Sequence, residues 1–317
     1  MINKHIRTDL AIEARELYSE DRNIEIPGVK VEQEKGNDYT VTRVDIFNEE
    51  GKQIMGKEKG VYITIESKLI SFDDDDSREI IIDAIHKELS KLLGDFKNKK
   101  ALVIGLGNWN ITSDALGPKV VANTLVTRHL FEAYNKEYDD DVNEVAALSP
   151  GVMGITGIET SETVKALVEM IKPDVVIAVD ALASRKLERV NNTVQISTAG
   201  ISPGAGIGNV RKALDQEYLN VPVIAIGVPT VVDAATLTSD VIDYTIDNLI
   251  QESKKGKDFY KMLKSLKEEE KYSLIKDILE PYGQNVVVTP KDIDEIIDNL
   301  SYVISTAINK SLHPGIN

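Results

Sequence analysis

Two runs of mainly hydrophobic residues, at 101–107 and 174–180, dominate the pattern along this chain of 317 residues. Both runs are rich in Val, Ile and Leu, which is typical of strands buried on both faces of a parallel sheet. Other segments alternate in character, and they predict strands at 144–148, 193–197 and 221–228 and helices near 117–132, 160–171 and 238–252. This alternation predicts the α/β class, with a doubly wound, mostly parallel sheet flanked by helices.

The regions on either side of this core have different patterns. Polar and apolar residues alternate at 39–47 and 61–65, which predicts a small antiparallel β-element. Helical spacing of apolar residues predicts further helices over residues 11–21, about 77–96 and Pro290 to about Ser311. We therefore expect a single α/β domain over residues 10–317, with a small β-subdomain around 38–67 and C-terminal helices over 253–312.

Composition and charge narrow the class of protein. Hydrophobic residues make up 42 % of the chain, which predicts a globular protein. The 37 basic and 52 acidic residues give a net charge of −15, which argues against direct binding of nucleic acid. Cysteine is absent, so disulfides and thiolate chemistry are excluded. With no secretory signal and no apolar stretch near the roughly 20 residues that span a bilayer, we expect a cytoplasmic protein without membrane contact.

Two glycine motifs suggest other activities, but their details argue against both. Gly105 and Gly107 follow a strand as in a dinucleotide-binding loop, yet Asn110 stands where the third glycine belongs. Residues 200–204 match the G-x-S-x-G motif of serine hydrolases, and Asp233 and His313 follow in the usual order. The residue after the serine must donate its backbone N–H to an oxyanion, and Pro203 has none.

The sequence offers few candidate ligands for a metal ion. The four histidines are His5, His86, His129 and His313, and no two of them have the spacing of a zinc motif. The run Asp73 to Asp76 resembles a cation site, but aspartates just before a helix also cap it and complement its dipole. We favour this second interpretation of the aspartate run.

Two aspartates remain as candidate catalytic groups. Asp114 follows the first hydrophobic strand, and Asp180 ends the second. Because ligands of parallel sheets bind beyond the carboxyl ends of the strands, we expect both carboxylates over one cleft. Two acids that share a cleft share a proton, so one can act as general base and the other as general acid in hydrolysis. Capping of the following helix is the alternative role for Asp114.

At these residues the chain resembles the germination protease family of spore-forming bacteria. The resemblance rests on long motifs that span most of the chain, at residues 105–110, 114–118, 125–130, 149–160, 179–183, 203–209 and 226–234. It implies an endopeptidase that degrades small acid-soluble spore proteins at germination, in the forespore or spore core. It also implies a homotetrameric zymogen that loses a short N-terminal segment.

The family is similar in fold to hydrogenase maturation proteases, which hold a metal with two acids and one histidine. In that comparison Asp114 and Asp180 take the acid positions, and none of the four histidines lies between Asp180 and Leu312. We therefore expect catalysis by the two aspartates without a cofactor, and a divalent cation bound by them remains an alternative. A binding module that has this fold but no activity is a further alternative.

The remaining candidate residues concern the substrate. Thr8-Asp9-Leu10-Ala11-Ile12-Glu13 is similar to the sequences that the family cleaves, after an acidic residue and before a large apolar one. The resemblance therefore predicts self-cleavage between Asp9 and Leu10, with residues 1–9 as the propeptide. A simple helix N-cap at Thr8 or Asp9 is the alternative. Candidate substrate-binding residues are Asn108, Trp109, Thr156, Glu159, Gly204 and Gly206, together with Arg128 and Arg185 for the acidic residue before the cut bond.

Overall fold

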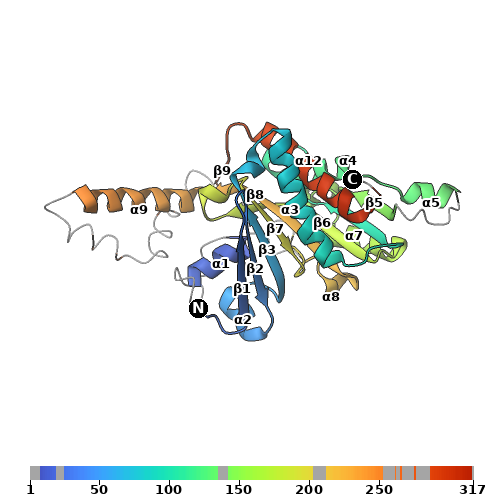
Figure 1. Ribbon diagram of the computed structural model, residues 1–317, viewed down its shortest axis with the longest axis horizontal. Coiled ribbons are helices and arrows are strands. Elements are labelled where there is room, and N and C mark those ends of the chain that lie inside the picture. The colour runs from blue at the N-terminus through green and yellow to red at the C-terminus, as the bar shows by residue number, and fades with distance from the viewer. Residues whose placement is uncertain are drawn as a thin grey trace.

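The computed structural model describes residues 8–18, 25–134, 142–202, 212–252 and 286–315, with the single residues 261, 265 and 275. These residues form one mixed sheet with helices against both faces (Figure 1). The predicted α/β class is therefore confirmed. Along the sheet, the strands follow the order β1-β2-β3-β7-β8-β6-β4-β5, and β9 pairs with β8 beside this path.

One half of the sheet is parallel and contains the two hydrophobic runs. Its strands are β8 (Val223–Asp233), β6 (Val175–Ser184), β4 (Lys100–Gly105) and β5 (Glu144–Leu148). The run at 101–107 forms the centre of this half with the run at 174–180, because β4 lies directly beside β6.

The other half of the sheet is antiparallel. It contains β7 (Thr193–Ser197), β3 (Gly60–Glu66), β2 (Thr40–Ile46) and the edge strand β1 (Val29–Lys35), while β9 (Val287–Val288) pairs with β8. The predicted β-element at 38–67 thus continues the main sheet, since β3 pairs with β7 and β7 pairs with β8. The sheet is accordingly mixed, with parallel pairing confined to four strands.

The strands of the parallel half are covered on both faces, which explains their continuous hydrophobicity. In β6, Ile177 and Val179 pack toward α3 (Asp75–Leu93), α4 (Leu116–Asn123) and α12 (Ile293–Leu312). Val176 and Ala178 point to the opposite face, where they pack with α7 (Thr160–Ile171) and α8 (Gln216–Leu219). Successive side chains of a strand alternate between faces, so both sets of positions must be apolar here.

The helix predicted at 117–132 is two helices, and that prediction was wrong about their continuity. α4 ends at Asn123 and α5 (Arg128–Tyr134) begins after a four-residue gap. Thr127 lies in the gap because its backbone and hydroxyl are held by β5: its N–H donates to Val145 O at 2.9 Å, and Val145 N–H donates to its Oγ1 at 2.9 Å. These bonds to a strand replace the helical bonds that would have continued α4.

The remaining helices lie around the sheet or project from it. α1 (Ala11–Tyr18) and α2 (Glu49–Met55) pack against the antiparallel half through Val44, Ile46 and Tyr62. α6 (Met153–Thr156) precedes α7, and α9 (Ala234–Glu252) extends away from the body of the molecule (Figure 1). Three 3₁₀ turns complete the described elements: η1 (Lys68–Ser71), η2 (Thr112–Asp114) and η3 (Leu187–Arg189).

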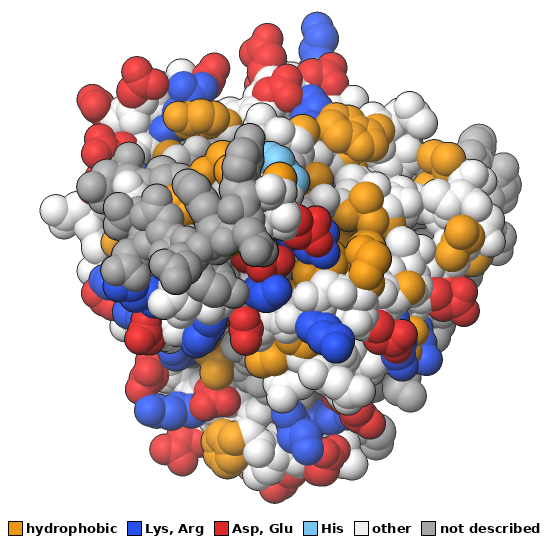
Figure 2. Space-filling view, turned by 90° about the vertical axis from the view of Figure 1, so that its right-hand side faces the viewer, with side chains coloured by type: hydrophobic (Ala, Val, Ile, Leu, Met, Phe, Trp, Pro, Cys, Tyr) orange, Lys and Arg blue, Asp and Glu red, His pale blue; other side chains and the backbone are white. Residues whose placement is uncertain are grey.

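The helical tail predicted after residue 252 is described only in part. The final helix is found as α12, close to its predicted bounds, whereas most of 253–285 lies outside the described residues. Within the described part of the chain, none of the helices combines the length and hydrophobicity that crossing a bilayer requires. Acidic and basic side chains are mixed on the face that Figure 2 presents.

Candidate active site

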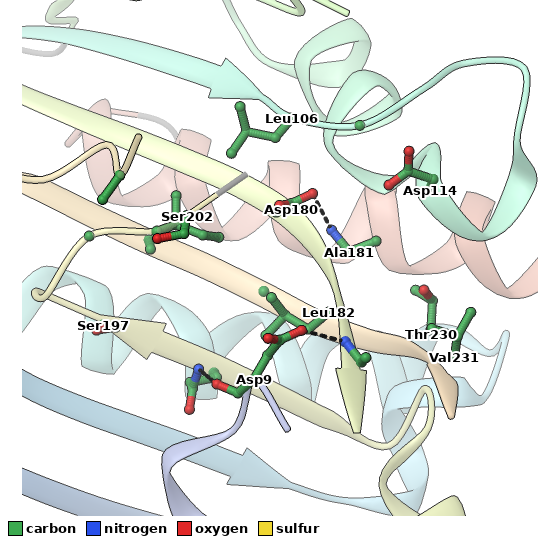
Figure 3. Close-up of a pocket in the computed structure, with 18 of the residues that line it drawn as sticks. Asp9, Leu106, Asp114, Asp180, Ala181, Leu182, Ser197, Ser202, Thr230 and Val231 are labelled. Atoms are coloured by element: carbon green, nitrogen blue, oxygen red, sulfur yellow. Dashed lines mark hydrogen bonds between the residues drawn. The ribbon is translucent and has the colours of Figure 1, made fainter. Parts of the chain in front are cut away.

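A cavity of about 570 Å³ lies where the two halves of the sheet meet. The parallel half contributes residues of β6 and β8 and the loop after β4, and the antiparallel half contributes β7, Tyr62 of β3 and the segment after α2. The start of the described N-terminal segment also lines it, through Asp9 (Figure 3). Both predicted catalytic aspartates, Asp114 and Asp180, line this cavity.

Asp114 is placed by a loop that folds back tightly on the end of β4. A Cβ atom at Gly107 would lie 2.0 Å from Asp114 O, and one at Gly117 would lie 2.2 Å from Leu106 O. Gly107 also has a φ of 111°, which residues with a side chain rarely adopt. The Asn108 N–H donates to Asp114 O at 3.0 Å and closes the loop. These glycines explain the sequence motif at 105–117: only they allow the backbone contacts that hold Asp114 at the cavity.

Asp180 lies within a strand and does not end it, contrary to the prediction. β6 continues to Ser184 because β8 accompanies it, with a register shift between Leu182 and Ala183. β4 ends earlier, at Gly105 opposite Val179, so Asp180 is the first residue of β6 beyond its neighbour β4. Its side chain is 6 % exposed, and its Oδ1 accepts a hydrogen bond from Ala181 N–H at 2.9 Å.

A third strand connects the two aspartates. The Thr230 hydroxyl of β8 donates to Ser113 O at 2.6 Å, so β8 holds the residue directly before Asp114. β8 also pairs with β6 at Asp180, which lies opposite Gly227. The loop that carries Asp114 and the strand that carries Asp180 are thus fixed to the same neighbour. Two carboxylates that line one cavity are suited to acid–base chemistry on water.

The N-terminal segment enters the same cavity in an extended form before α1 begins. The Asp9 N–H donates to Ala183 O at 3.1 Å, and the Asp9 carboxylate accepts from Ala183 N–H at 2.8 Å (Figure 3). Leu10 is fully buried and packs with Leu182 and Ile12. The predicted cleavage site is therefore held near the end of β6 by one backbone bond and one carboxylate bond on one side and by apolar contacts on the other.

Gln195 of β7 holds this segment across the predicted cleavage site. Its Nε2 donates to Asp9 O at 3.2 Å, and its Oε1 accepts from Ala11 N–H at 2.7 Å. Gly227 pairs with Asp180 on one side and with Gln195 on the other, so these three residues form one row across β6, β8 and β7. Sequence analysis missed Gln195 because it lies inside a strand; a single amide within a buried strand was the available signal.

Lys57 is the second residue that sequence analysis missed. Its Nζ donates to Thr8 O at 2.9 Å. Burial lowers the pKa of Lys57, while the nearby charges of Asp9 and Glu13 act in the opposite direction. A cation near the acidic residue of the predicted cleavage site is thus supplied by the segment after α2.

Most of the other predicted substrate-binding residues do not line the cavity. Asn108 shapes the Asp114 loop, Trp109 is 53 % exposed, and Thr156 and Glu159 lie near the start of α7 next to lining residues. Arg128 forms ion pairs with Glu132 and Glu144 on the outer part of the parallel half. Arg185 contacts the N-terminal segment through its backbone N–H. Gly204 and Gly206 lie outside the described residues.

The structure also tests the two alternative sites, a serine triad and a metal site. Ser202 lines the cavity, but His313 accepts from Asn143 N–H at 3.3 Å and lies beside Leu125 O, and Asp233 caps α9 through Thr236 N–H. A serine triad is therefore not assembled. Among the described residues, no three His, Cys, Asp or Glu side chains are grouped so that they could hold a metal ion.

Comparisons with known proteins identify the family of this chain. The family model for germination protease matches residues 8–265 and 246–317. The chain is 52 % identical to the germination protease of Caldanaerobacter subterraneus over 311 residues, and 51 % identical to that of Clostridium tetani. These alignments cover 98 % of this chain and 95 % and 96 % of the relatives. The germination protease of Bacillus licheniformis is 42 % identical, over 98 % of this chain and 94 % of its own.

Similarity to solved structures is weaker. The [NiFe] hydrogenase maturation protease HycI from Thermococcus kodakarensis shares 15 % sequence identity, with a TM-score of 0.32, over 70 % of this chain and 98 % of its own. That likeness is too low to define chemistry. The close relatives are sufficient to identify the class, and the protein is a peptidase. More specifically, the chain belongs to the germination protease family.

Proposed function

We propose that this protein is an autoprocessing endopeptidase in which Asp114 and Asp180 activate water for hydrolysis of a peptide bond. One observation carries the proposal: Asp9, directly before the predicted cleavage bond, lines the same cavity as both aspartates and is held there by two hydrogen bonds to Ala183. An acidic residue followed by a buried leucine has the chemistry that the family cleaves. The segment would therefore be the enzyme's first substrate, with residues 1–9 as the propeptide.

The site suggests how the reaction proceeds. One carboxylate takes a proton from water as the oxygen attacks the peptide carbonyl carbon, and the other carboxylic acid protonates the departing amine. The C–N bond then breaks, which yields a new carboxylate and a new amino terminus. Gln195 donates to Asp9 O and accepts from Ala11 N–H, so it aligns the peptide on both sides of the Asp9–Leu10 bond. Such alignment lowers the entropy cost of reaching the transition state.

Selectivity for an acidic residue before the cut bond is assigned to two groups. The Ala183 N–H donates to the Asp9 carboxylate at 2.8 Å, and the charge of Lys57 lies close to it. A backbone donor with a nearby cation binds a carboxylate more strongly than a neutral group of the same shape. The arrangement replaces Arg128 and Arg185 in the role expected for them.

Membership in the germination protease family supports small acid-soluble spore proteins as the substrate, in the cytoplasm of the forespore and spore core. It also supports a homotetramer. The net charge of −15 suggests that the enzyme acts on coat protein that has left DNA, because two polyanions repel each other. Equal rates of cleavage for free and DNA-bound substrate would contradict this part of the proposal.

Replacing the aspartates tests the mechanism. Asp180→Asn and Asp114→Asn should each lower kcat by at least about 10³-fold, since each removes a group that transfers a proton. Both variants keep the side-chain shape, so circular dichroism and urea unfolding should show folded proteins. Asp215→Asn is the control: it makes the same change at an aspartate that caps α8 and is not proposed to be catalytic. Full activity in both active-site variants would refute the mechanism and leave a binding module of this fold.

Two further measurements complete the test. N-terminal sequencing after activation should give Leu10 as the first residue, and an active enzyme that retains Met1 would contradict processing. Chelation should leave the turnover unchanged, because the described residues supply no third ligand beside the two acids. Loss of activity on chelation and its recovery with a divalent cation would instead favour a carboxylate-bound metallopeptidase.

A further inference from the structure

The last of the sequence motifs lies almost entirely in β8, and the proposed chemistry leaves it unexplained. Its pairing with β6 is irregular, because Leu182 lies opposite Pro229. The next residue of β6, Ala183, lies opposite Val231. Thr230 is thus an extra residue in β8, which makes this a β-bulge, a feature that is rare between parallel strands and frequent beside active sites. Pro229 suits this place because it has no N–H to pair.

The bulge brings Thr230 to the loop that carries Asp114. Successive residues of a regular strand point to opposite faces, yet Thr230 and Val231 both line the cavity (Figure 3). Thr230 is 1 % exposed, and its hydroxyl donates to Ser113 O at 2.6 Å. That carbonyl belongs to the planar peptide unit that leads into Asp114, and the next carbonyl, Asp114 O, accepts from Asn108 N–H. Both peptide units beside Asp114 are therefore held, which fixes the direction in which its side chain leaves the backbone.

Thr230 is itself held by parts of the molecule other than this loop. The hydroxyl of Thr289, directly after β9, donates to Thr230 O at 2.8 Å. On the other side, the Asn191 N–H donates to Pro229 O at 2.7 Å. The bulge is therefore anchored independently of the Asp114 loop, and it gives the loop a fixed point of attachment.

We propose that Thr230 is a positioning residue, which orients the Asp114 carboxylate for its reaction together with Asp180. The inference rests on the proposed function, because Thr230 has this task only where the two aspartates are catalytic. Two carboxylates that share a proton titrate with two separate pKa values, and the separation grows as the groups approach each other. In the proposed mechanism the pair is active with one proton bound. The orientation of Asp114 therefore sets both the rate and the pH range of the reaction.

Self-cleavage of the full chain, followed as a function of pH, tests the inference. The segment is part of the chain, so the first-order rate contains no association step. Thr230→Val keeps the side-chain shape and removes the hydroxyl. We expect its maximal rate to fall by about 10- to 100-fold, as for a misplaced catalytic group, and the acidic and basic limbs of the pH–rate profile to move toward each other. Thr230→Ser keeps the hydroxyl and should retain the wild-type profile.

Thr127→Val is the matched control for a bond that is only structural. Thr127 is 2 % exposed, its hydroxyl donates to Asn143 O at 2.6 Å, and it does not line the cavity. Thr127 also accepts from Val145 N–H, so the control should lose at least as much stability in urea unfolding as Thr230→Val. Its rate of self-cleavage and both limbs of its profile should stay as in the wild type.

The possible failures have different meanings. A wild-type rate in folded Thr230→Val, or a slower rate with unmoved limbs, would overturn the positioning role and leave the proposed function intact. If the Val variant does not fold, Thr230→Ala removes the same bond with a smaller side chain and is judged by the same two criteria. Full self-cleavage by both Asp114→Asn and Asp180→Asn would instead refute the proposed function and the inference together.

Discussion

The two halves of the sheet contribute to the cavity in different ways. The parallel half presents Asp114 and Asp180 where β4 ends and β6 continues beside β8 only. The antiparallel half presents Gln195 from the face of β7 and Lys57 from the segment after α2, and both contact the backbone of the N-terminal segment. The groups proposed for chemistry thus come from the parallel half, whereas the side chains that hold the peptide come from the antiparallel half.

Because different halves of the sheet supply them, catalysis and peptide binding can be altered by separate substitutions. The aspartates depend on close packing of backbone around Gly107 and Gly117. The peptide contacts depend on individual polar side chains, which can be replaced without disturbing the strands. Variants of the parallel half should therefore affect folding and chemistry together, and variants of the antiparallel half should affect peptide binding alone.

The largest effect is expected in the parallel half. In Gly117→Ala the new Cβ would lie 2.2 Å from Leu106 O and 2.6 Å from Val179 O, so α4 must move away from β4 and β6. We expect the free energy of unfolding to fall by about 3 kcal/mol, as for severe overpacking, with loss of turnover. Urea denaturation measures the change. Gly154→Ala is the control, since nothing lies within 4 Å of its Cβ position; equal stability of the two variants would contradict the role of the close contact.

The second-largest effect is expected from removing the contact between Gln195 and the N-terminal segment. Gln195→Leu keeps the side-chain size but removes both bonds to the segment, and two bonds of about 1 kcal/mol each correspond to roughly 30-fold slower self-cleavage. The appearance of the new N-terminus over time measures the rate. The same substitution at Gln33, which donates to Thr42 on the outer strands, is the control. An unchanged rate in Gln195→Leu would mean that the clamp has no part in processing.

A smaller effect is expected for the charge near Asp9. Lys57→Met removes the cation and should lower the preference for Asp over Asn before the cut bond by about tenfold, as expected for losing a charge interaction of about 1.4 kcal/mol with Asp9. The ratio of kcat/KM for the two peptides measures it. Lys59→Met is the control because Lys59 pairs with the exposed Glu49. The same Asp preference in both variants would exclude Lys57 as its source.

The smallest expected effect is on the pH dependence of folding stability. Burial alone would raise the pKa of Glu16, but the hydrogen bond and charge of Arg189, with Lys186, lower it from 4.5 to about 2. A depressed pKa stabilises the fold above the ordinary pKa, and this stabilisation is lost as the pH falls from 4.5 toward 2. Glu16→Gln should therefore be less stable than the wild type by about 1 kcal/mol after screening above about pH 4.5, and the difference should shrink as the pH falls toward 2. A difference that persists at pH 2 would contradict this origin.

The sequence was sufficient for features that depend on repeated local patterns. Continuous apolar runs predicted β4 and β6, and the position of Asp114 and Asp180 relative to those runs predicted that they share a cavity. β1 was missed because an exposed edge strand with the sequence VKVEQEK has no buried face and therefore no apolar alternation. Its charged side chains instead protect an open edge.

Long-range contacts explain what the sequence could not predict. Gln195 lies 186 residues after Asp9 in the sequence, and two strands separate Lys57 from Asp9. No local pattern shows that these residues meet. The end of β6 was placed too early at Asp180 because the later residues, Ala181 to Ser184, are kept in the strand by β8 and not by their own pattern. The break between α4 and α5 likewise depends on a bond between Thr127 and β5.

The continuation of β6 beyond β4 also has a consequence for solubility. Backbone groups on a strand without a neighbour pair readily with any extended chain, which is a common route to aggregation. In the present structure Asp9 covers this edge at Ala183, through one backbone bond and one carboxylate bond. Removal of residues 1–9 would uncover it. Processing would therefore give the enzyme a strand edge for recruiting an unfolded or extended polypeptide, and its short length, ending at Ser184, would limit self-association.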